Sequence, residues 1–217
     1  IWNRSHHIMV VAGQSRSDSD RNKILNEFIT KYRIPLLGDT IANIHGMDNK
    51  NITHHDLILG KDGMLKKMLQ PDLLITFGNG VISKNLKNFL RSANPAHHWD
   101  IREAGYHPDT FQCLSHRIRL KPDVFFQKAL GFFPENTKSS DYLNQWVLEE
   151  KNTEKKIPGF FDSNLQFSEL KAVHEVIHSL PDRTSLHLAN SMPVRLANLI
   201  ASLKPGIEVF SNRGVSG

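Results

Sequence analysis

The sequence contains a single cysteine, Cys113, among its 217 residues. One thiol excludes an internal disulfide, and such sparse cysteine usage is typical of proteins in the reducing cytosol. We therefore expect a cytoplasmic location, and we expect Cys113 itself to be a small apolar residue on a strand.

Long apolar runs are also missing. No stretch approaches the roughly 20 apolar residues of a membrane-spanning helix, and the first residues, IWNR, do not resemble a signal peptide. We expect no membrane partner. Hydrophobic residues make up 39% of the chain and charged residues 23%, which indicates an ordinary globular protein with enough apolar material for a core.

Positive charge is not concentrated anywhere. The formal net charge is +5, but the lysines are scattered, and Lys66-Lys67 and Lys155-Lys156 are the only close pairs. Nucleic-acid-binding proteins more often show a basic stripe with interleaved aromatic residues. We expect no nucleic-acid partner.

Three adjacent histidine pairs, His6-His7, His54-His55 and His97-His98, suggest a metal site at first sight. Neighbouring side chains point to opposite faces of a strand and do not converge on a helix. No His or Cys spacing suited to a zinc site occurs around them. We expect no metal ligands in this chain.

What the sequence does contain is an alternation of apolar runs and amphipathic segments. Ile8–Ala12 (IMVVA) predicts a buried parallel strand. Asp18–Lys31 predicts a helix capped by Ser17 or Asp18, and Ile34–Leu37 predicts a second strand. This β-α-β order predicts a parallel sheet with a right-handed crossover.

The alternation continues after a weak, polar connection. The predicted elements are a helix broken or bent near Gly60 and Gly63 (His55–Leu69), a strand (Leu73–Phe77), a helix (Ser83–Ser92), two strands (Ala96–Ile101 and Cys113–Leu120) and a closing helix (Pro122–Leu130). Five strands alternating with helices predict an α/β fold with a doubly wound, mostly parallel sheet. The turn Gly78-Asn79-Gly80 lacks the third glycine of a dinucleotide-binding loop, so no dinucleotide is expected.

Composition divides the chain into three parts. We predict a first α/β domain over residues 1–132, a linker over residues 133–165 with a short helical piece around Tyr142–Glu150, and a second, incomplete α/β unit over residues 166–217. The second unit begins with an amphipathic helix, Phe167–Leu180, with Ser168 as its cap and Pro181 as its stop.

The last segment has the order strand, helix, strand: Ser185–Ala189, Pro193–Leu203 and Ile207–Phe210. Polar residues follow both strands, Asn190-Ser191 in one case and residues 211–214 (SNRG) in the other. They are expected at the carboxyl edge of the sheet, where open α/β sheets bind ligands.

Ser191, Arg195 and Arg213 could form an anion site at this edge. Ser191 stands where an N-cap should, Arg195 follows four residues later, and Arg213 ends the next strand. A hydroxyl, guanidinium groups and a helix N-terminus together favour a carboxylate or a phosphate. On spacing alone, a routine N-cap and solvent-facing arginines are the favoured interpretation.

The residue sequences of the two polar segments, taken together, change that interpretation. Segments 190–195 (NSMPVR) and 211–217 (SNRGVSG) together resemble the thiamine-diphosphate-dependent 2-succinyl-5-enolpyruvyl-6-hydroxy-3-cyclohexene-1-carboxylate synthases of menaquinone biosynthesis. These enzymes, below called the carboxylate synthases, join 2-oxoglutarate to isochorismate with loss of carbon dioxide. The resemblance implies that this chain is the middle domain and the start of the C-terminal domain of such an enzyme.

The resemblance also implies roles for individual residues. Ser191 and Arg195 would hold a carboxylate of the 2-oxoglutarate-derived intermediate, with Arg213 beside them. Lys84, in the segment 78–84 (GNGVISK), would contact isochorismate. Gly214, Ser216 and Gly217 would contact thiamine diphosphate.

The glutamate that activates the cofactor and the ligands of its Mg²⁺ would lie outside the sequence. We therefore expect the 217 residues alone to be inactive and to bind thiamine diphosphate weakly. The resemblance further implies a homodimer or a homotetramer.

Two alternatives stay open. The chain could belong to another thiamine-dependent decarboxylase or synthase with a different acceptor. It could instead be a non-catalytic regulatory domain that binds an anionic metabolite through Arg195 and Arg213. The residues after Gly217 would separate these hypotheses, since a continuing cofactor-binding sequence excludes the regulatory domain.

Overall fold

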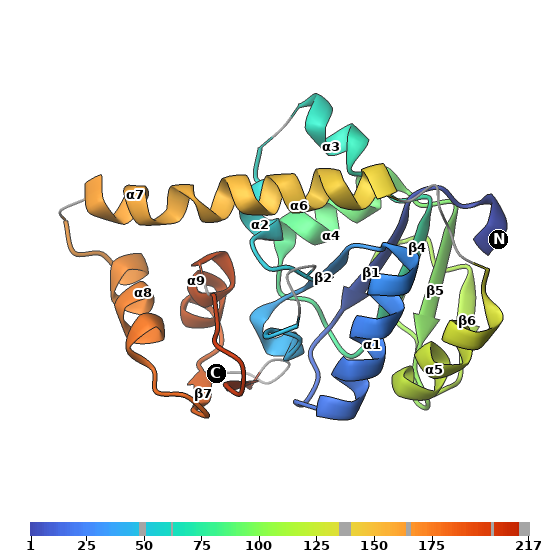
Figure 1. Cartoon of the computed structure of the whole chain (residues 1–217). Helices are drawn as coiled ribbons and strands as arrows, with labels where there is room; N and C mark the ends of the chain where they lie inside the picture. Colours follow the sequence, from blue (N-terminus) through green and yellow to red (C-terminus); the bar gives the residue numbers. More distant parts are fainter. Residues whose placement is uncertain (48–50, 62, 135–139, 164–165, 201, 213–217) are drawn as a thin grey trace.

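The computed structural model of the chain (Figure 1) describes residues 1–47, 51–61, 63–134, 140–163, 166–200 and 202–212. A six-stranded sheet with the order β3-β2-β1-β4-β5-β6 dominates the structure, and each pair of neighbouring strands in it is parallel. Its strands are β1 (Ile8–Ala12), β2 (Leu36–Gly38), β3 (Asn51–Ile52), β4 (Leu73–Phe77), β5 (His97–Ile101) and β6 (His116–Ile118). The predicted doubly wound α/β fold is confirmed.

The central strand β1 is apolar along its whole length because both faces of the sheet are covered. Ile8, Val10 and Ala12 point into one hydrophobic cluster, and Met9 and Val11 point into the other. Val10 pairs with Leu36 of β2 on one side and with Ile75 of β4 on the other.

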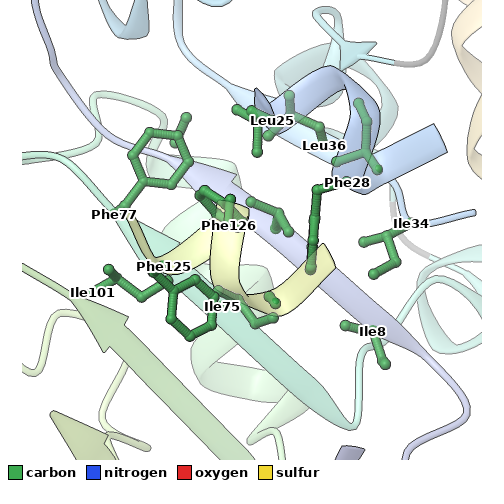
Figure 2. Close-up of a cluster of buried hydrophobic side chains, with 14 of the residues drawn as sticks. Ile8, Leu25, Phe28, Ile34, Leu36, Ile75, Phe77, Ile101, Phe125 and Phe126 are labelled. Atoms are coloured by element: carbon green, nitrogen blue, oxygen red, sulfur yellow. The ribbon is translucent and has the colours of Figure 1, made fainter. Parts of the chain in front are cut away.

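Helices α1 (Ser19–Tyr32) and α5 (Pro122–Phe132) cover the first face (Figure 1). Figure 2 shows how Phe28 of α1 and Phe126 of α5 meet the strand residues Ile8 and Ile75, and the rings of the two phenylalanines lie 4.9 Å apart. The predicted cap of α1 is confirmed, because the Asp18 side chain accepts a hydrogen bond from Arg21 N.

The other face is covered by α4 (Lys84–Ala93) and by α6 (Ser140–Glu154). The Trp146 side chain of α6 is fully buried against Phe89 of α4. Glu150 fixes the same helix by accepting hydrogen bonds from Thr53 Oγ1 at 2.6 Å and from His54 Nδ1 at 2.8 Å.

A segment predicted to be a short helical piece within a linker is therefore a 15-residue helix that belongs to the core of the large sheet. Helix α7 (Lys156–Ser163) follows it, and the two run across the top of the molecule towards the second unit (Figure 1). The domain limits 1–132, 133–165 and 166–217 stay predictions.

The second unit is a two-stranded parallel sheet of β7 (Ser185–Leu188) and β8 (Glu208–Ser211) with helices α8 (Glu169–Ser179) and α9 (Met192–Ile200). Ser168 caps α8, as predicted, by accepting from Lys171 N. Ile41 and Ile82 of the first unit join the hydrophobic cluster of the second, so the two units share buried apolar surface.

Side chains of the first unit also cover the free edge of β8. Gln14 Nε2 donates to Ser211 O at 3.1 Å, and His45 Nε2 contacts Ile207 O. Between these contacts, Asn43 pairs with the backbone of Val209. The contacted residues, 207, 209 and 211, are alternate residues of one strand edge, so the three side chains take the place of a neighbouring strand.

Three local predictions need correction. The weak connection after Thr40 contains the short strand β3, and β2 lies one to two residues later than expected. The helix predicted over His55–Leu69 is divided, as the predicted break near Gly60 and Gly63 indicated, into α2 (His55–Ile58) and α3 (Met64–Met68). Cys113 precedes β6 instead of lying on a strand; it is half-buried, and burial raises the pKa of its thiol to about 11.

Among the helices that the structure describes, none is long and apolar enough to cross a membrane.

Candidate functional site

A cavity of about 720 Å³ lies where the carboxyl ends of β1 and β4 face those of β7 and β8. Its walls are formed by Gln14, Ser15, Arg16, Asn79, His187, Leu188, Ala189, Val209, Phe210, Ser211 and Asn212. In the strand order β3-β2-β1-β4-β5-β6, the direction of winding reverses between β1 and β4. Parallel α/β sheets bind ligands at this reversal point, so the cavity is the candidate functional site.

The wall contributed by the large sheet consists of two interlocked turns. Gly13 N donates to Phe77 O at 2.8 Å, and Asn79 N donates to Gln14 O at 2.8 Å. A Cβ atom on Gly13 would stand 1.9 Å from the carbonyl oxygen of Asn79, so only glycine permits this approach. The backbones that carry Gln14 and Asn79 are thereby fixed to each other.

The opposite wall joins the two polar segments that follow β7 and β8. Asn190 N donates to Asn212 Oδ1 at 3.2 Å. Within the two strands, the ring of His187 stacks on that of its register partner Phe210, with a centroid distance of 5.0 Å. The segment that carries Ser191 and the segment that leads to Arg213 are therefore held side by side.

Ser191 and Arg195 lie beside this wall, and both side chains are exposed. Ser191 directly precedes α9, as predicted for a cap, but its φ is +74°, whereas an N-cap residue is usually extended. Arg195 lies on α9 between the buried residues Val194 and Ala197 and faces outward. Neither residue is among those that line the cavity.

Four of the predicted site residues, Arg213, Gly214, Ser216 and Gly217, lie outside the described residues. Lys84 is the first residue of α4 and is exposed, and it does not line the cavity. The preceding Ser83 caps the helix by accepting from Leu86 N at 2.9 Å and donates to Asp56 Oδ1 at 2.7 Å.

Sequence analysis missed the polar residues of the large-sheet wall, Gln14, Arg16 and Asn79, and also His187. A usable signal existed for the first three, because they follow the two clearest apolar strands of the chain. They come together only because β1 and β4 are neighbours in the sheet.

A buried polar network lies behind the Gly78-Asn79-Gly80 turn. Thr76 Oγ1 donates to Asp100 Oδ1 at 2.8 Å and contacts His98 Nε2 at 2.9 Å. His107 Nδ1 lies 2.7 Å from Asp100 Oδ2. Burial lowers the pKa of His98 to about 4 and outweighs the opposite effect of Asp100, so His98 is neutral at pH 7 and donates from Nε2 to Thr76.

Two other histidines meet buried or half-buried carboxylates. His55 Nε2 lies 3.3 Å from Asp39 Oδ1, and both side chains are fully buried. Burial alone would lower the pKa of His55, but the Asp39 carboxylate raises it above its ordinary value. For Glu150, burial favours the neutral acid, but the contact with His54 and the hydrogen bonds it accepts lower its pKa.

The described residues do not fit a magnesium diphosphate group. Mg²⁺ requires oxygen ligands gathered around one point, and no group of three or more His, Cys, Asp or Glu side chains in the described ranges could hold a metal ion. The residues that line the cavity do include several able to donate hydrogen bonds and one cation, Arg16, a combination suited to an anionic ligand.

Comparisons with known proteins point in one direction. A family model described as "Middle domain of thiamine pyrophosphate" matches residues 2–188. The 2-succinyl-5-enolpyruvyl-6-hydroxy-3-cyclohexene-1-carboxylate synthase of Cytophaga hutchinsonii is 35% identical over 211 residues, which are 97% of this chain and 36% of that protein. The synthase of the same name from Flavobacterium johnsoniae is 34% identical over 220 residues, covering 100% of this chain and 38% of that protein. The chain thus spans little more than a third of the length of these relatives.

Proposed function

The chain belongs to the thiamine pyrophosphate enzyme family, as a middle domain, and we propose that the complete protein is a carboxylate synthase that joins 2-oxoglutarate to isochorismate. Similarity to synthases of this name extends over 97–100% of the chain in the two relatives above. Thiamine diphosphate supplies the decarboxylation chemistry in such an enzyme. We assign the cofactor and its Mg²⁺ to parts of the enzyme outside the described residues, with Gly214, Ser216 and Gly217 contacting the cofactor.

The role of this chain is to bind and orient acidic substrates. Ser191 and Arg195 hold a carboxylate of 2-oxoglutarate, and Arg213 lies beside them. Lys84 contacts isochorismate from the large-sheet unit. A cytoplasmic location and a homodimeric or homotetrameric assembly complete the proposal.

The observation that carries the proposal is the hydrogen bond from Asn190 N to Asn212 Oδ1 at 3.2 Å. It joins the two polar segments whose sequences resemble the carboxylate synthases. Because the bond ties the residue before Ser191 to the residue before Arg213, the two predicted anion contacts start from neighbouring backbone positions. A carboxylate ligand held by Ser191 and Arg195, with Arg213 beside them, would account for the joining of these two segments.

Replacement of Arg195 in the complete enzyme tests the proposal. Loss of a hydrogen bond to a charged group costs about 1.5–3 kcal/mol, which corresponds to a roughly 10- to 100-fold rise in KM for 2-oxoglutarate. Arg195→Ala should show this rise with a smaller effect on isochorismate. Arg195→Lys should recover only part of it, because an ammonium group cannot form the planar fork of a guanidinium.

Arg119→Ala is the matched control, because Arg119 is exposed and follows β6 at the far edge of the large sheet. It should leave both KM values unchanged. An Arg195→Ala enzyme within twofold of the parent for 2-oxoglutarate would show that Arg195 is an ordinary surface residue and that the carboxylate assignment is wrong.

A further inference from the structure

We propose that Asn79 donates a hydrogen bond from its side-chain amide to a carboxylate of isochorismate, and that Arg102 is the positioning residue that turns the amide in this direction. The proposal rests on the function proposed above. It adds a substrate contact from the large-sheet unit, in which the resemblance to the synthases assigns Lys84 alone.

The orientation of the Asn79 amide follows from its contact with Arg102. Arg102 Nη1 donates to Asn79 Oδ1 at 3.3 Å, and Arg102 Nη2 donates to Gly78 O at 2.7 Å. A guanidinium group has only donors, so the Asn79 atom that faces it must be the oxygen and not the nitrogen. The Asn79 NH₂ group therefore points away from Arg102.

The direction away from Arg102 leads to the candidate site. Asn79 lines two cavities: the 720 Å³ cavity, and a small one of about 40 Å³ that Arg102 also lines. Arg102 lines only the small cavity of these two, so with Oδ1 turned to Arg102 the proposal assigns Nδ2 to the side of the large cavity. Within the described part of the chain, Nδ2 donates to no protein acceptor.

The backbone of Asn79 is held in place by its neighbours. Asn79 N donates to Gln14 O at 2.8 Å, and the Asn79 carbonyl packs directly over Gly13. The Asn79 side chain is exposed, and its contact with Arg102 is what orients the amide on this fixed backbone. Such pre-orientation reduces the ordering that ligand binding requires.

Arg102 is itself held by a buried carboxylate. Its Nε lies 3.6 Å from Asp100 Oδ2, and Asp100 is fixed from behind by Thr76 and His107. The Asp100 carboxylate also balances the charge of Arg102. Arg102 therefore acts by orienting Asn79, and Arg16 supplies the positive charge that faces the cavity.

The choice of isochorismate follows from the position of Asn79. It lies on the large-sheet wall, in the same segment as Lys84, whereas Ser191 and Arg195 belong to the second unit. An amide N–H donor suits a carboxylate oxygen, and isochorismate carries two carboxylates. The hydrogen bond from Asn79 thus orients the carboxylate, whereas the ammonium group of Lys84 supplies positive charge.

Substitutions of Asn79 in the complete enzyme distinguish a donor from a space-filling residue. Asn79→Asp keeps an oxygen towards Arg102, and so keeps the fold, but replaces the NH₂ group by a second, negatively charged oxygen. It should raise KM for isochorismate by about 100-fold, against about 10-fold for Asn79→Ala, which only removes the donor. KM for 2-oxoglutarate should stay within twofold. Equal effects of the two substitutions, or values within twofold of the parent for both, would overturn the proposal.

A double-mutant cycle tests the positioning role of Arg102. Arg102→Ala should raise KM for isochorismate about as much as Asn79→Ala does, and it should add nothing when Asn79 is already alanine. Arg102→Lys should restore part of the affinity of the parent enzyme, because a lysine ammonium can still donate to Asn79 Oδ1. Additive effects would show that Arg102 does not act through Asn79.

The two proposals fail in different ways. If Arg195→Ala raises KM for 2-oxoglutarate and the Asn79 variants leave isochorismate kinetics unchanged, only the present inference is wrong. If the enzyme does not turn over these substrates at all, the proposed function is wrong and this assignment falls with it.

Discussion

Asn43 and the backbone of Val209 exchange two hydrogen bonds: Val209 N donates to Asn43 Oδ1 at 2.7 Å, and Asn43 Nδ2 donates to Val209 O at 2.9 Å. Both residues are buried. One amide side chain thus reproduces the pairing of a strand neighbour and connects the large sheet to β8. The same Nδ2 also donates to Ser15 O at 2.8 Å, next to the candidate site.

Removal of the Asn43 side chain should therefore destabilise the protein strongly. Asn43 has a φ of +53°, so glycine can replace it without backbone strain. Asn43→Gly leaves the N–H and C=O groups of Val209 unpaired, which should lower the free energy of unfolding by about 2–4 kcal/mol in urea denaturation. Asn94→Gly is the control, because Asn94 is also left-handed and its side chain makes no hydrogen bond within the described ranges. Equal losses in the two variants would contradict the role of the Asn43 amide.

Gly13→Ala should be far more damaging than Gly80→Ala, although the two glycines lie in the same pair of turns. A Cβ atom on Gly13 meets the backbone oxygen of Asn79 at 1.9 Å, whereas a Cβ atom on Gly80 meets no atom within 4 Å. We expect Gly13→Ala to cost about 3 kcal/mol of stability and Gly80→Ala to stay within about 0.5 kcal/mol of the parent. Thermal unfolding of the two variants measures the difference, and similar melting temperatures would show that the turns can separate.

His98 should make the protein acid-sensitive. Its folded-state pKa of about 4 lies below its ordinary value, so the unfolded chain binds the extra proton more readily. The contribution of neutral His98 to the free energy of unfolding is complete above about pH 6.5. It is lost as the pH falls towards 4, by up to about 3 kcal/mol. Denaturation midpoints across this range should fall less steeply in His98→Gln than in the parent. The exposed His116 serves as the control, since His116→Gln should keep the slope of the parent.

The pair of His55 and Asp39 predicts the opposite dependence on pH. Because the pKa of His55 is raised, the folded protein binds the proton more tightly than the unfolded chain. The stability from this pair is complete below about pH 6.5 and is lost as the pH rises through the raised pKa. His55→Gln should remove this alkaline loss while retaining a hydrogen-bond donor for Asp39. A parent protein with no decline in stability above pH 6.5 would show that the pair is not ionised.

The sequence predicted the elements whose signals are local. Ile8–Ala12 and Leu73–Phe77 are apolar because both faces of the sheet are buried, and both predicted strands match the structure residue for residue. The caps Asp18 and Ser168 were equally visible, since a cap is defined by its own helix. Strand β3 was missed because two residues, Asn51 and Ile52, are too few to show a period.

The candidate site was predicted only in part, for a physical reason. Asn190 and Asn212 follow β7 and β8, two strands joined by a single helix. A β-α-β unit of this kind places the ends of its two strands at the same edge of the sheet. Gln14 and Asn79 are far apart in sequence, with β2, β3 and β4 between them. Their contact depends on β4 lying beside β1 in the sheet. That choice of neighbour is decided by the packing of the helices over both faces, which no local pattern encodes.

The three side chains that cover the edge of β8 have a consequence for sequence divergence. Gln14, Asn43 and His45 contact only backbone atoms of Ser211, Val209 and Ile207. For these hydrogen bonds, the required side-chain chemistry therefore resides in the first unit. Substitutions along β8 can change its side chains while its carbonyl groups stay in place, whereas each of the three partners must remain a side chain able to donate to a carbonyl. Selection on these hydrogen bonds should thus act on Gln14, Asn43 and His45, whereas Ile207 and Val209 are constrained only to stay apolar by the shared hydrophobic cluster.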